Sequence, residues 1–307
     1  MADVKANEVK ALRDRTGAGM MDCKKALVEC NGDIEEAIDW LRKKGLAAAA
    51  KKSGRVAAEG LVGVHVHGHK GAIAEINAET DFVARNELFQ KYVGDVVELA
   101  CRHNCEVEQL QSLEYPQTGR TVSEELTNLI AVIGENMGIR RVCHLSVSDG
   151  VIASYVHNKI SANLGKIGIL LALESSGDKE KLSEIGKKIA MHIAAANPQS
   201  TSIEDLDPAI LERERNVVTE QAKGTGKPAE FIEKIVEGRI RKFYEEVVLL
   251  EQVFVIDGST KVKDVVAAAS KEIGAPIVVK GFVKFVLGEG IEKQVTDFAA
   301  EVAAQLS

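Results

Sequence analysis

Three histidines at alternate positions, His65, His67 and His69, come closest in type and spacing to a metal site. Imidazole is a common metal ligand, and alternate residues of a β-strand lie on one face of it. The spacing matches no standard zinc signature, however, and the flanking Gly68 and Gly71 place His69 in a turn. We therefore interpret the histidines as part of a solvent-facing strand, and we expect the chain to hold no metal ion and no other cofactor.

Two glycine-rich segments share part of the pattern of nucleotide-binding loops. Residues 224–227 read Gly-Thr-Gly-Lys, like the end of a phosphate-binding loop. Gln221 stands where that motif needs its first glycine, and Pro228 stands where it needs serine or threonine. Residues 17–19 lack the third glycine of a dinucleotide-binding fingerprint and join two predicted helices. Both segments are better explained as breaks between helices.

Signatures of covalent catalysis are absent from the sequence. It contains no Gly-x-Ser-x-Gly elbow, no His-Glu-x-x-His helix and no cysteine–histidine signature. The five cysteines are odd in number and irregularly spaced, which indicates a reducing compartment rather than a disulfide framework. Cys101 and Cys105 are expected to be buried thiols. We expect a protein that is not an enzyme.

Two segments have the composition of contact surfaces. Met20 and Met21 follow a glycine turn, and methionine suits adaptable contacts, although a core role for one of the pair is equally well supported. Residues 79–86 lie between a predicted strand and a predicted helix, where functional loops are common. Within them, Phe82 beside Asp81 fits either a helix cap with its hydrophobic staple or an anchor that inserts into a partner. The residue pattern alone favours the cap.

Composition narrows the class of protein further. The chain has 307 residues, of which 45% are hydrophobic and 28% charged, and its net charge is −7. That length is typical of about two domains of a soluble globular protein. The negative charge argues against a nucleic-acid partner, which would require a basic face. The polar N-terminus and the lack of long apolar runs predict a cytoplasmic protein with no membrane partner.

The elements that must position these residues begin with three short helices. The third has Asp33 as its N-cap and is expected to end at Gly45. Residues 46–59 are rich in alanine and lysine, and we expect a partly helical linker with a boundary near Arg55.

The central region predicts an α+β fold with two similar halves, each a small antiparallel sheet covered by a helix. A strand–turn–strand–helix pattern occurs as 61–67, 72–77 and 87–101, and again as 151–157, 167–173 and 179–196. A helix over 123–136 lies between the halves, and strands at 253–256 and 282–287 are expected to complete the second sheet.

The last third of the chain predicts an antiparallel helical hairpin. Asp207 and Pro208 suit the N-cap and first position of one helix, whose apolar stripe extends from 210 to 221. A second stripe over 231–247 follows a turn rich in glycine and proline. We expect a protruding arm that packs on itself and permits a homodimer, and a final amphipathic helix over 290–306.

Several segments resemble the signature blocks of a known family. Residues 12–27, LRDRTGAGMMDCKKAL, and residues 78–86, AETDFVARN, resemble the two signature segments of the elongation factor Ts family. Further blocks of the family are similar to residues 133–141, 190–198, 236–243 and, at the C-terminus, 288–303. The resemblance covers essentially the whole chain in order, and its first two motifs are long and specific.

The resemblance implies a fold that agrees with the predicted elements. The family has a helical N-terminal domain that resembles ubiquitin-associated (UBA) domains, a two-part α/β core, a helical dimerisation arm and a C-terminal helical module. The corresponding parts of this chain are 1–55 for the N-terminal domain and linker, 56–150 for the first core half, 151–201 with 250–288 for the second, 202–249 for the arm and 289–307 for the C-terminal module.

The resemblance also implies a function, which is to bind the GTPase elongation factor Tu and to promote the release of its GDP so that GTP can bind. In the family, one loop intrudes between helices of the GTPase and dislodges Mg²⁺; it is matched here by Thr80, Asp81, Phe82 and Val83. Phe82 would be the wedge, and Asp81 would make polar contacts beside it. The chain departs from the family pattern at Glu79, where many members have glutamine.

Other contact residues carry over in the same way. The family's N-terminal contact surface is matched by Arg13, Met20 and Met21, and its core contacts are matched by Ile133 and His157. The C-terminal helix would dock on a helix of the GTPase. The chain also departs from the family pattern around 156–158 and carries extra residues near 159–163 and 271–279.

Single features of the sequence are compatible with two other classes of function. The N-terminal helices could serve an adaptor that binds a peptide or a ubiquitin-like protein, and residues 56–307 would then be dispensable for binding. A metal site at the three alternate histidines would instead indicate an enzyme. Both are less well supported than the exchange factor, because the resemblance extends over the whole chain.

Overall fold

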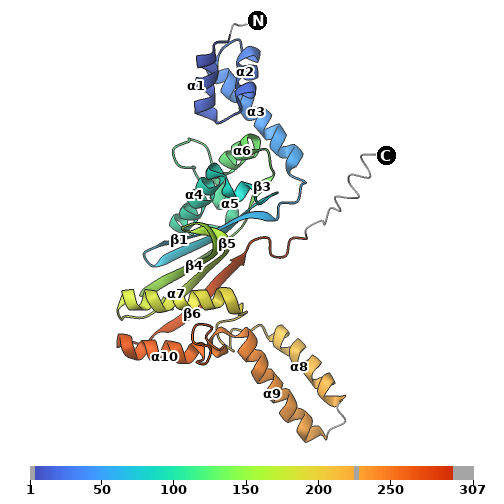
Figure 1. Ribbon diagram of the computed structural model, residues 1–307, viewed down its shortest axis with the longest axis vertical. Coiled ribbons are helices and arrows are strands. Elements are labelled where there is room, and N and C mark those ends of the chain that lie inside the picture. Colours follow the sequence, from blue (N-terminus) through green and yellow to red (C-terminus); the bar gives the residue numbers. More distant parts are fainter. Residues whose placement is uncertain (1–3, 225–227, 293–307) are drawn as a thin grey trace. The chain divides into compact units, whose positions relative to one another are not determined.

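The computed structural model describes residues 4–224 and 228–292 (Figure 1). The described residues divide into two compact units, of which the first comprises 4–62, 74–142 and 286–292 and the second 63–73, 143–224 and 228–285. The helices described in the first unit are α1 (Ala6–Thr16), α2 (Met20–Glu29), α3 (Ile34–Lys52), η1 (Val83–Arg85), α4 (Glu87–His103), α5 (Val107–Ser112) and α6 (Val122–Ile133). Those described in the second are α7 (Lys179–Ala196), α8 (Pro208–Lys223), α9 (Ala229–Val247), η2 (Leu249–Glu251) and α10 (Val262–Ile273).

The strands confirm the α+β class. They are β1 (Glu59–His67), β2 (Lys70–Ala78), β3 (Met137–Ser146), β4 (Gly150–Ser161), β5 (Leu164–Glu174) and β6 (Val278–Val286). In the first unit, β2 pairs with β1 and with β3; in the second, β5 pairs with β1, β4 and β6. We expected two separate small sheets, but the strands belong to one six-stranded sheet. The reason is that the hairpin of β1 and β2, with nine residues in each strand, contributes to both units.

The three N-terminal helices pack around a small core that includes Leu12, Cys23 and Leu27, all fully buried. Asp33 caps α3 as predicted, since its carboxylate accepts a hydrogen bond from the backbone N–H of Glu36.

The expectation that the third helix ends at Gly45 is wrong, because α3 continues to Lys52 and takes in the first half of the linker, which was predicted to be partly helical. Residues 46–50 read Leu-Ala-Ala-Ala-Ala, and alanine has the highest intrinsic helix propensity. Gly45 instead serves packing: a Cβ at this position would lie 3.3 Å from the Cβ of Ala131 on α6. The missing side chain lets α3 and α6 approach closely.

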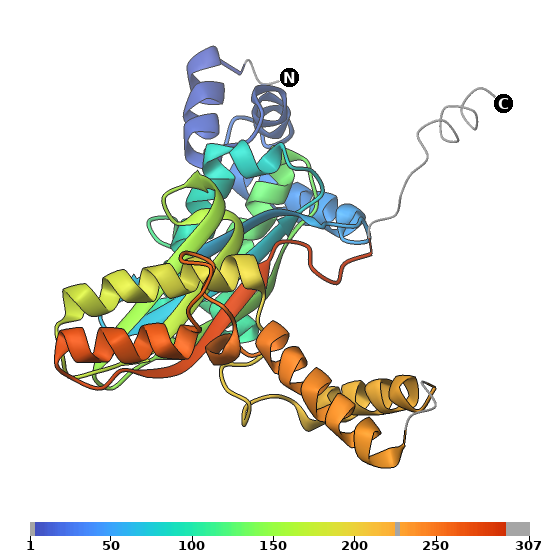
Figure 2. The ribbon, with the colours of Figure 1, turned by 60° about the horizontal axis from the view of Figure 1, so that its bottom comes forward.

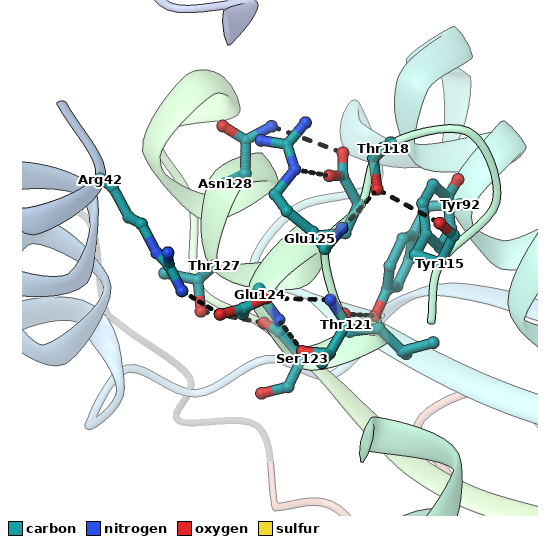
Figure 3. A network of polar contacts seen from close by, with 12 residues as sticks. Arg42, Tyr92, Tyr115, Thr118, Thr121, Ser123, Glu124, Glu125, Thr127 and Asn128 are labelled. Carbon is teal, nitrogen blue, oxygen red and sulfur yellow. Dashed lines mark hydrogen bonds and ion pairs between the residues drawn. The ribbon is translucent and has the colours of Figure 1, made fainter. Parts of the chain in front are cut away.

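A polar network joins α3 and the start of α6 (Figure 3). Thr121 and Glu124 form a capping box, in which each side chain accepts a hydrogen bond from the other residue's backbone N–H, at 3.2 and 2.9 Å. The same Glu124 carboxylate pairs with the guanidinium of Arg42 on α3. Nearby, the buried Tyr92 of α4 donates to the carbonyl oxygen of Val122 at 3.0 Å. These contacts connect α3, α4 and α6 at one helix end.

In the second unit, α7 packs on β4 and β5 and lies beside α10 (Figure 2). Fully buried side chains at this interface include Leu171, Leu173, Ile189 and Ile193. The predicted bounds of the helix at 179–196 are confirmed. The predicted strands at 151–157 and 167–173 are confirmed and longer, because β4 and β5 extend to a tight antiparallel turn at 162–163.

The predicted strand at 253–256 is wrong. Val253 makes only an isolated bridge with Lys261. The backbone N–H of Val255 donates to Nδ1 of the buried His192 at 3.2 Å, so it is not available to a neighbouring strand. Nε2 of His192 lies 2.9 Å from Oε1 of Gln252, and burial lowers the pKa of the imidazole. The structure also contains β3, α5 and α10, which were not predicted.

The helical hairpin is confirmed, with α8 and α9 side by side (Figure 2). Asp207 caps α8, with Pro208 at its first position. The two helices pack on each other through a core that includes Val218, Val236 and Ile240. Part of the turn, 225–227, and most of the predicted C-terminal helix, 293–307, lie outside the described residues.

Glu75 on β2 is fully buried and accepts hydrogen bonds from four groups. Their donors and distances are Arg141 Nε at 2.6 Å, the Gly288 N–H at 2.8 Å, Arg140 Nη1 at 2.9 Å and Asn77 Nδ2 at 3.0 Å. Burial raises the pKa of this carboxyl, but the hydrogen bonds lower it by more, so its pKa lies below the ordinary value. The network ties β2 to β3 and to residues 286–289.

Replacing Gly288 with alanine tests how closely this segment packs. Gly288 has a φ of 72°, and an added Cβ would lie 2.4 Å from the carbonyl oxygen of Ala58. We expect Gly288→Ala to lower the free energy of unfolding, measured in urea, by about 3 kcal/mol. Gly290 also has a positive φ, 76°, but its added Cβ would meet only Arg140 Nη2, at 3.8 Å. Gly290→Ala should cost only about 1 kcal/mol, and equal losses would contradict the close approach at Gly288.

The charge of Glu75 should make stability depend on pH. Its folded-state pKa is depressed, so the stability it contributes is present above the unfolded pKa and is lost as the pH falls through the folded pKa. Glu75→Gln should lower the free energy of unfolding at pH 7 by roughly 3 kcal/mol, since two arginines lose their carboxylate. The deficit should shrink as the pH falls below about 4.3 in a series of urea titrations. The exposed Glu29→Gln is the control, and a pH-independent deficit for Glu75→Gln would refute this role of the charge.

Candidate partner-binding loop

The loop at 79–86 connects β2 to α4 and presents an aromatic side chain to solvent. Phe82 is 77% exposed, and the neighbouring Asp81 is exposed as well. The next two residues, Val83 and Ala84, are buried at 3% and 5% and begin the short helix η1. Phe82 therefore stands at the apex of a loop whose following turn is anchored in the protein.

Hydrogen bonds hold the loop on the N-terminal side of Phe82. The carboxylate of Glu135 accepts from the backbone N–H of Thr80 at 2.9 Å and from its hydroxyl at 2.7 Å. The carboxylate of Glu79 accepts from the backbone N–H of Asn136 at 2.5 Å and pairs with Arg55 at 3.4 Å. Residues 79–80 and 135–136 thus exchange hydrogen bonds in both directions.

A helix cap holds the loop on the other side. The Oδ1 atom of Asn86 accepts from the backbone N–H groups of Leu88 and Phe89, at 2.9 and 3.3 Å, and so caps α4. The interpretation of Phe82 and Asp81 as a cap with its staple is therefore wrong, because another residue caps the helix and the phenyl ring does not pack on it. A wedge that inserts into a partner remains the alternative.

The two consecutive methionines begin α2 and both face solvent. Met20 is 46% exposed and Met21 is 77% exposed, so the alternative that one of them is a core residue is not supported. Leu12 and Leu27 fill the core of these helices instead. Arg13, on α1, is also exposed. These side chains are accessible to a partner.

The other two predicted contact residues belong to different units. Ile133 is half-buried at the end of α6 in the first unit, close in sequence to the Glu135 that binds the loop. His157 is exposed on β4 in the second unit, where its Nδ1 lies 3.1 Å from the hydroxyl of Tyr155.

Comparison with known proteins assigns the chain to a family. A family model described as "Elongation factor TS" matches residues 79–289. The protein named elongation factor Ts from Rhodospirillum centenum is 63% identical over 304 residues, which is 99% of each chain. The proteins of the same name from Paramagnetospirillum magneticum and Rhodospirillum rubrum are 61% and 59% identical over 305 and 307 residues, covering 99% and 100% of this chain and 98% and 99% of theirs. The chain belongs to the elongation factor Ts family. Its role is therefore in translation elongation.

Glu135 and Asn136 of this elongation factor Ts family member were not predicted to belong to the candidate site, although both bind the loop. They were expected to end a helix over 123–136, but α6 stops at Ile133. Gly134, a frequent helix terminator, was the signal that could have placed them in a loop.

The histidines do not form a metal site within the parts of the chain that the structure covers. His65 is half-buried on β1, and His67 and His69 are exposed, with His69 in the turn as predicted. No group of three or more potential metal-ligating side chains is found among residues 4–224 and 228–292. Cys101 and Cys105 are buried, as predicted. Over the same residues, no helix is long and apolar enough to cross a membrane.

The exposure of Phe82 predicts that its side chain contributes little to stability. Phe82→Ala should change the free energy of unfolding by no more than about 0.5 kcal/mol. Phe89 on α4 is fully buried, and Phe89→Ala should cost about 3–5 kcal/mol. Urea unfolding of both variants measures the contrast, and a large loss for Phe82→Ala would mean that the ring packs within the protein.

Proposed function

We propose that this protein is a guanine-nucleotide exchange factor that binds elongation factor Tu with GDP, displaces Mg²⁺ and promotes GDP release so that GTP can bind. The loop that would act on the partner contains Thr80, Asp81, Phe82 and Val83. The observation that carries the proposal is the 77% exposure of Phe82 on a loop held at both sides. The full-length similarity to proteins named elongation factor Ts supports it.

Exchange follows from thermodynamic coupling. A factor that binds the nucleotide-free GTPase more tightly than the GDP-bound form must weaken GDP binding by the same ratio. Mg²⁺ bridges phosphate oxygens and neutralises their charge, so its loss weakens the hold on GDP. The chain needs to supply binding energy only, which is why we propose an exchange factor rather than an enzyme.

The properties of Phe82 suit a wedge. A large aromatic side chain transfers much apolar surface from water when it enters a partner, and aromatic residues are frequent hot spots of binding energy. The hydrogen bonds around the loop hold the backbone before and after Phe82 in place before binding. Less conformational entropy is then lost when the complex forms.

The remaining predicted contacts would extend the interface. Met20 and Met21 offer flexible apolar surface, and Arg13 adds a charge on the same group of helices. Ile133 and His157 would contribute the core contacts. We also propose that the chain has the five parts given above and that its C-terminal module docks on the GTPase. A cytoplasmic location is part of the same proposal.

A homodimer through the arm also remains a proposal. Val217 on α8 and Phe231 on α9 are 47% and 58% exposed, so the arm keeps apolar surface beyond its own core. No nucleic acid and no membrane are proposed as partners, in keeping with the net charge of −7.

The proposal is tested by the release of fluorescent GDP from purified elongation factor Tu at fixed free Mg²⁺. Sub-stoichiometric amounts of this protein should accelerate release with multiple turnovers. The control is the same elongation factor Tu with its own known exchange factor, which must accelerate GDP release. If this protein then gives no acceleration, it is not an exchange factor and only a binding role is left.

Phe82→Ala should reduce the acceleration by about tenfold or more, the loss expected for a binding hot spot. Its folding should be unchanged, so the loss would belong to the interface. Leu88→Ala is a suitable control, since Leu88 is also exposed, at 51%, but lies outside the loop's apex on α4. An exchange rate for Phe82→Ala equal to that of the wild type would rule out the wedge.

A further inference from the structure

We propose that Glu135 is a positioning residue for exchange: its carboxylate holds the loop at 79–86 in the geometry that presents Phe82, without needing to touch the partner itself. The inference rests on the proposed function of that loop. The inference adds to that function the group that orders the backbone leading to Phe82.

The geometry of the contact restricts Thr80 in two ways. One carboxylate oxygen of Glu135 accepts from the backbone N–H of Thr80 at 2.9 Å, and the other accepts from its hydroxyl at 2.7 Å. Two bonds from one carboxylate fix both the path of the main chain and the rotamer of the side chain. Hydrogen bonds to a charged acceptor are stronger than those between neutral groups. The restricted residue lies just before Asp81 and Phe82.

The end of α6 delivers Glu135 to the loop. Gly134 ends the helix in the left-handed region, with a φ of 93°, and its N–H donates to the carbonyl oxygen of Ile130 at 3.1 Å. This φ strongly favours glycine. The chain then leaves the helix axis, and Met137, at the start of β3, is buried. Glu135 is therefore fixed between a capped helix and a strand of the sheet.

In a second contact, the loop accepts a hydrogen bond instead of donating one. Glu79 accepts from the backbone N–H of Asn136 at 2.5 Å, while Asn136 Nδ2 donates to the carbonyl oxygen of Arg55 at 2.8 Å. Arg55 also pairs with the Glu79 carboxylate. A glutamine at position 79 could still accept the Asn136 N–H through its amide oxygen, but it would lose the ion pair. We call the four residues Glu79, Thr80, Glu135 and Asn136 the loop brace.

The polar residues of the brace are not themselves part of the hydrophobic core. Thr80 and Glu135 are only partly buried, whereas the residues that follow the wedge, Val83 and Ala84, are buried. Loss of the Glu135 carboxylate should therefore release the segment that leads to Phe82 and leave the rest of the unit folded. A released loop must be ordered again on binding, and exchange would slow accordingly.

Amide hydrogen exchange of the free protein, measured by mass spectrometry, tests the brace without any partner. In Glu135→Ala, the amide of Thr80, which loses its acceptor, should exchange about tenfold faster than in the wild type, while the amides of α4 keep their protection. Unchanged exchange at the Thr80 amide would refute the ordering role.

GDP release from elongation factor Tu tests the consequence. Glu135→Ala should reduce the acceleration about tenfold, and the reduction should disappear when Phe82→Ala is already present, because Glu135 acts through that side chain. A general loss of stability would instead reduce the rate equally in both backgrounds, and that outcome would overturn the proposal.

Two further variants separate geometry from charge and from stability. Glu135→Gln can accept the Thr80 N–H with its oxygen and donate to the Thr80 hydroxyl with its nitrogen, so it should stay within about threefold of the wild type. Glu124→Ala removes a carboxylate from the capping box of the same helix, at the other end of α6 (Figure 3). It should lower the melting temperature but not the exchange rate.

The outcomes distinguish this inference from the proposed function. If the wild type does not accelerate GDP release, the proposed function fails, and amide exchange alone decides whether the brace orders the loop. If the wild type is active but Glu135→Ala matches it, or if Glu135→Gln loses as much as Glu135→Ala, the positioning role of Glu135 is refuted while the proposed function stands.

Discussion

The buried carboxylate of Glu75 is the interaction on which the first unit depends. A charge without solvent is tolerated only when it is fully paired and hydrogen-bonded, and Arg140 and Arg141 of β3 supply that pairing. The requirement sets the neighbours of β2. The number of residues from Glu75 forward to Thr80 equals the number from Arg140 back to Glu135, which is the relation expected between two antiparallel segments. The buried ion pair and the loop brace therefore agree on one register, in which the loop after β2 meets the segment before β3.

This arrangement explains how the backbone that carries an exposed aromatic residue can stay in a defined position. Phe82 gains nothing from burial within its own chain, so the surrounding backbone must hold it. Hydrogen bonds to Glu135 hold the chain before Phe82, and the cap of α4 by Asn86 holds the chain after it. The free energy that orders the loop is then supplied by folding and does not have to come from the partner.

The second unit satisfies its buried polar groups in a similar way. His192 on α7 and Gln252 after η2 are both buried and hydrogen-bonded to each other. Gln252 Nε2 also donates to the carbonyl oxygen of Glu246 at the end of α9, at 2.7 Å. The base of the arm is thus connected to the helix that covers the sheet. The backbone at 253–256 is held by a hydrogen bond to His192 and forms no strand, although its residue types favour one.

The sequence by itself determined the features that depend on neighbouring residues. Apolar periodicity and caps within a few positions predicted α7, the helical hairpin and the roles of Asp33 and Asp207, and the signature segments led to the family. Tertiary structure alone decided that Gly45 packs against α6, that Phe82 is exposed, and that Glu135 reaches the loop. Each of these depends on a contact with a residue distant in sequence, or on the absence of one. Local patterns carry no information about which distant groups will meet, because that follows from the packing of the whole unit.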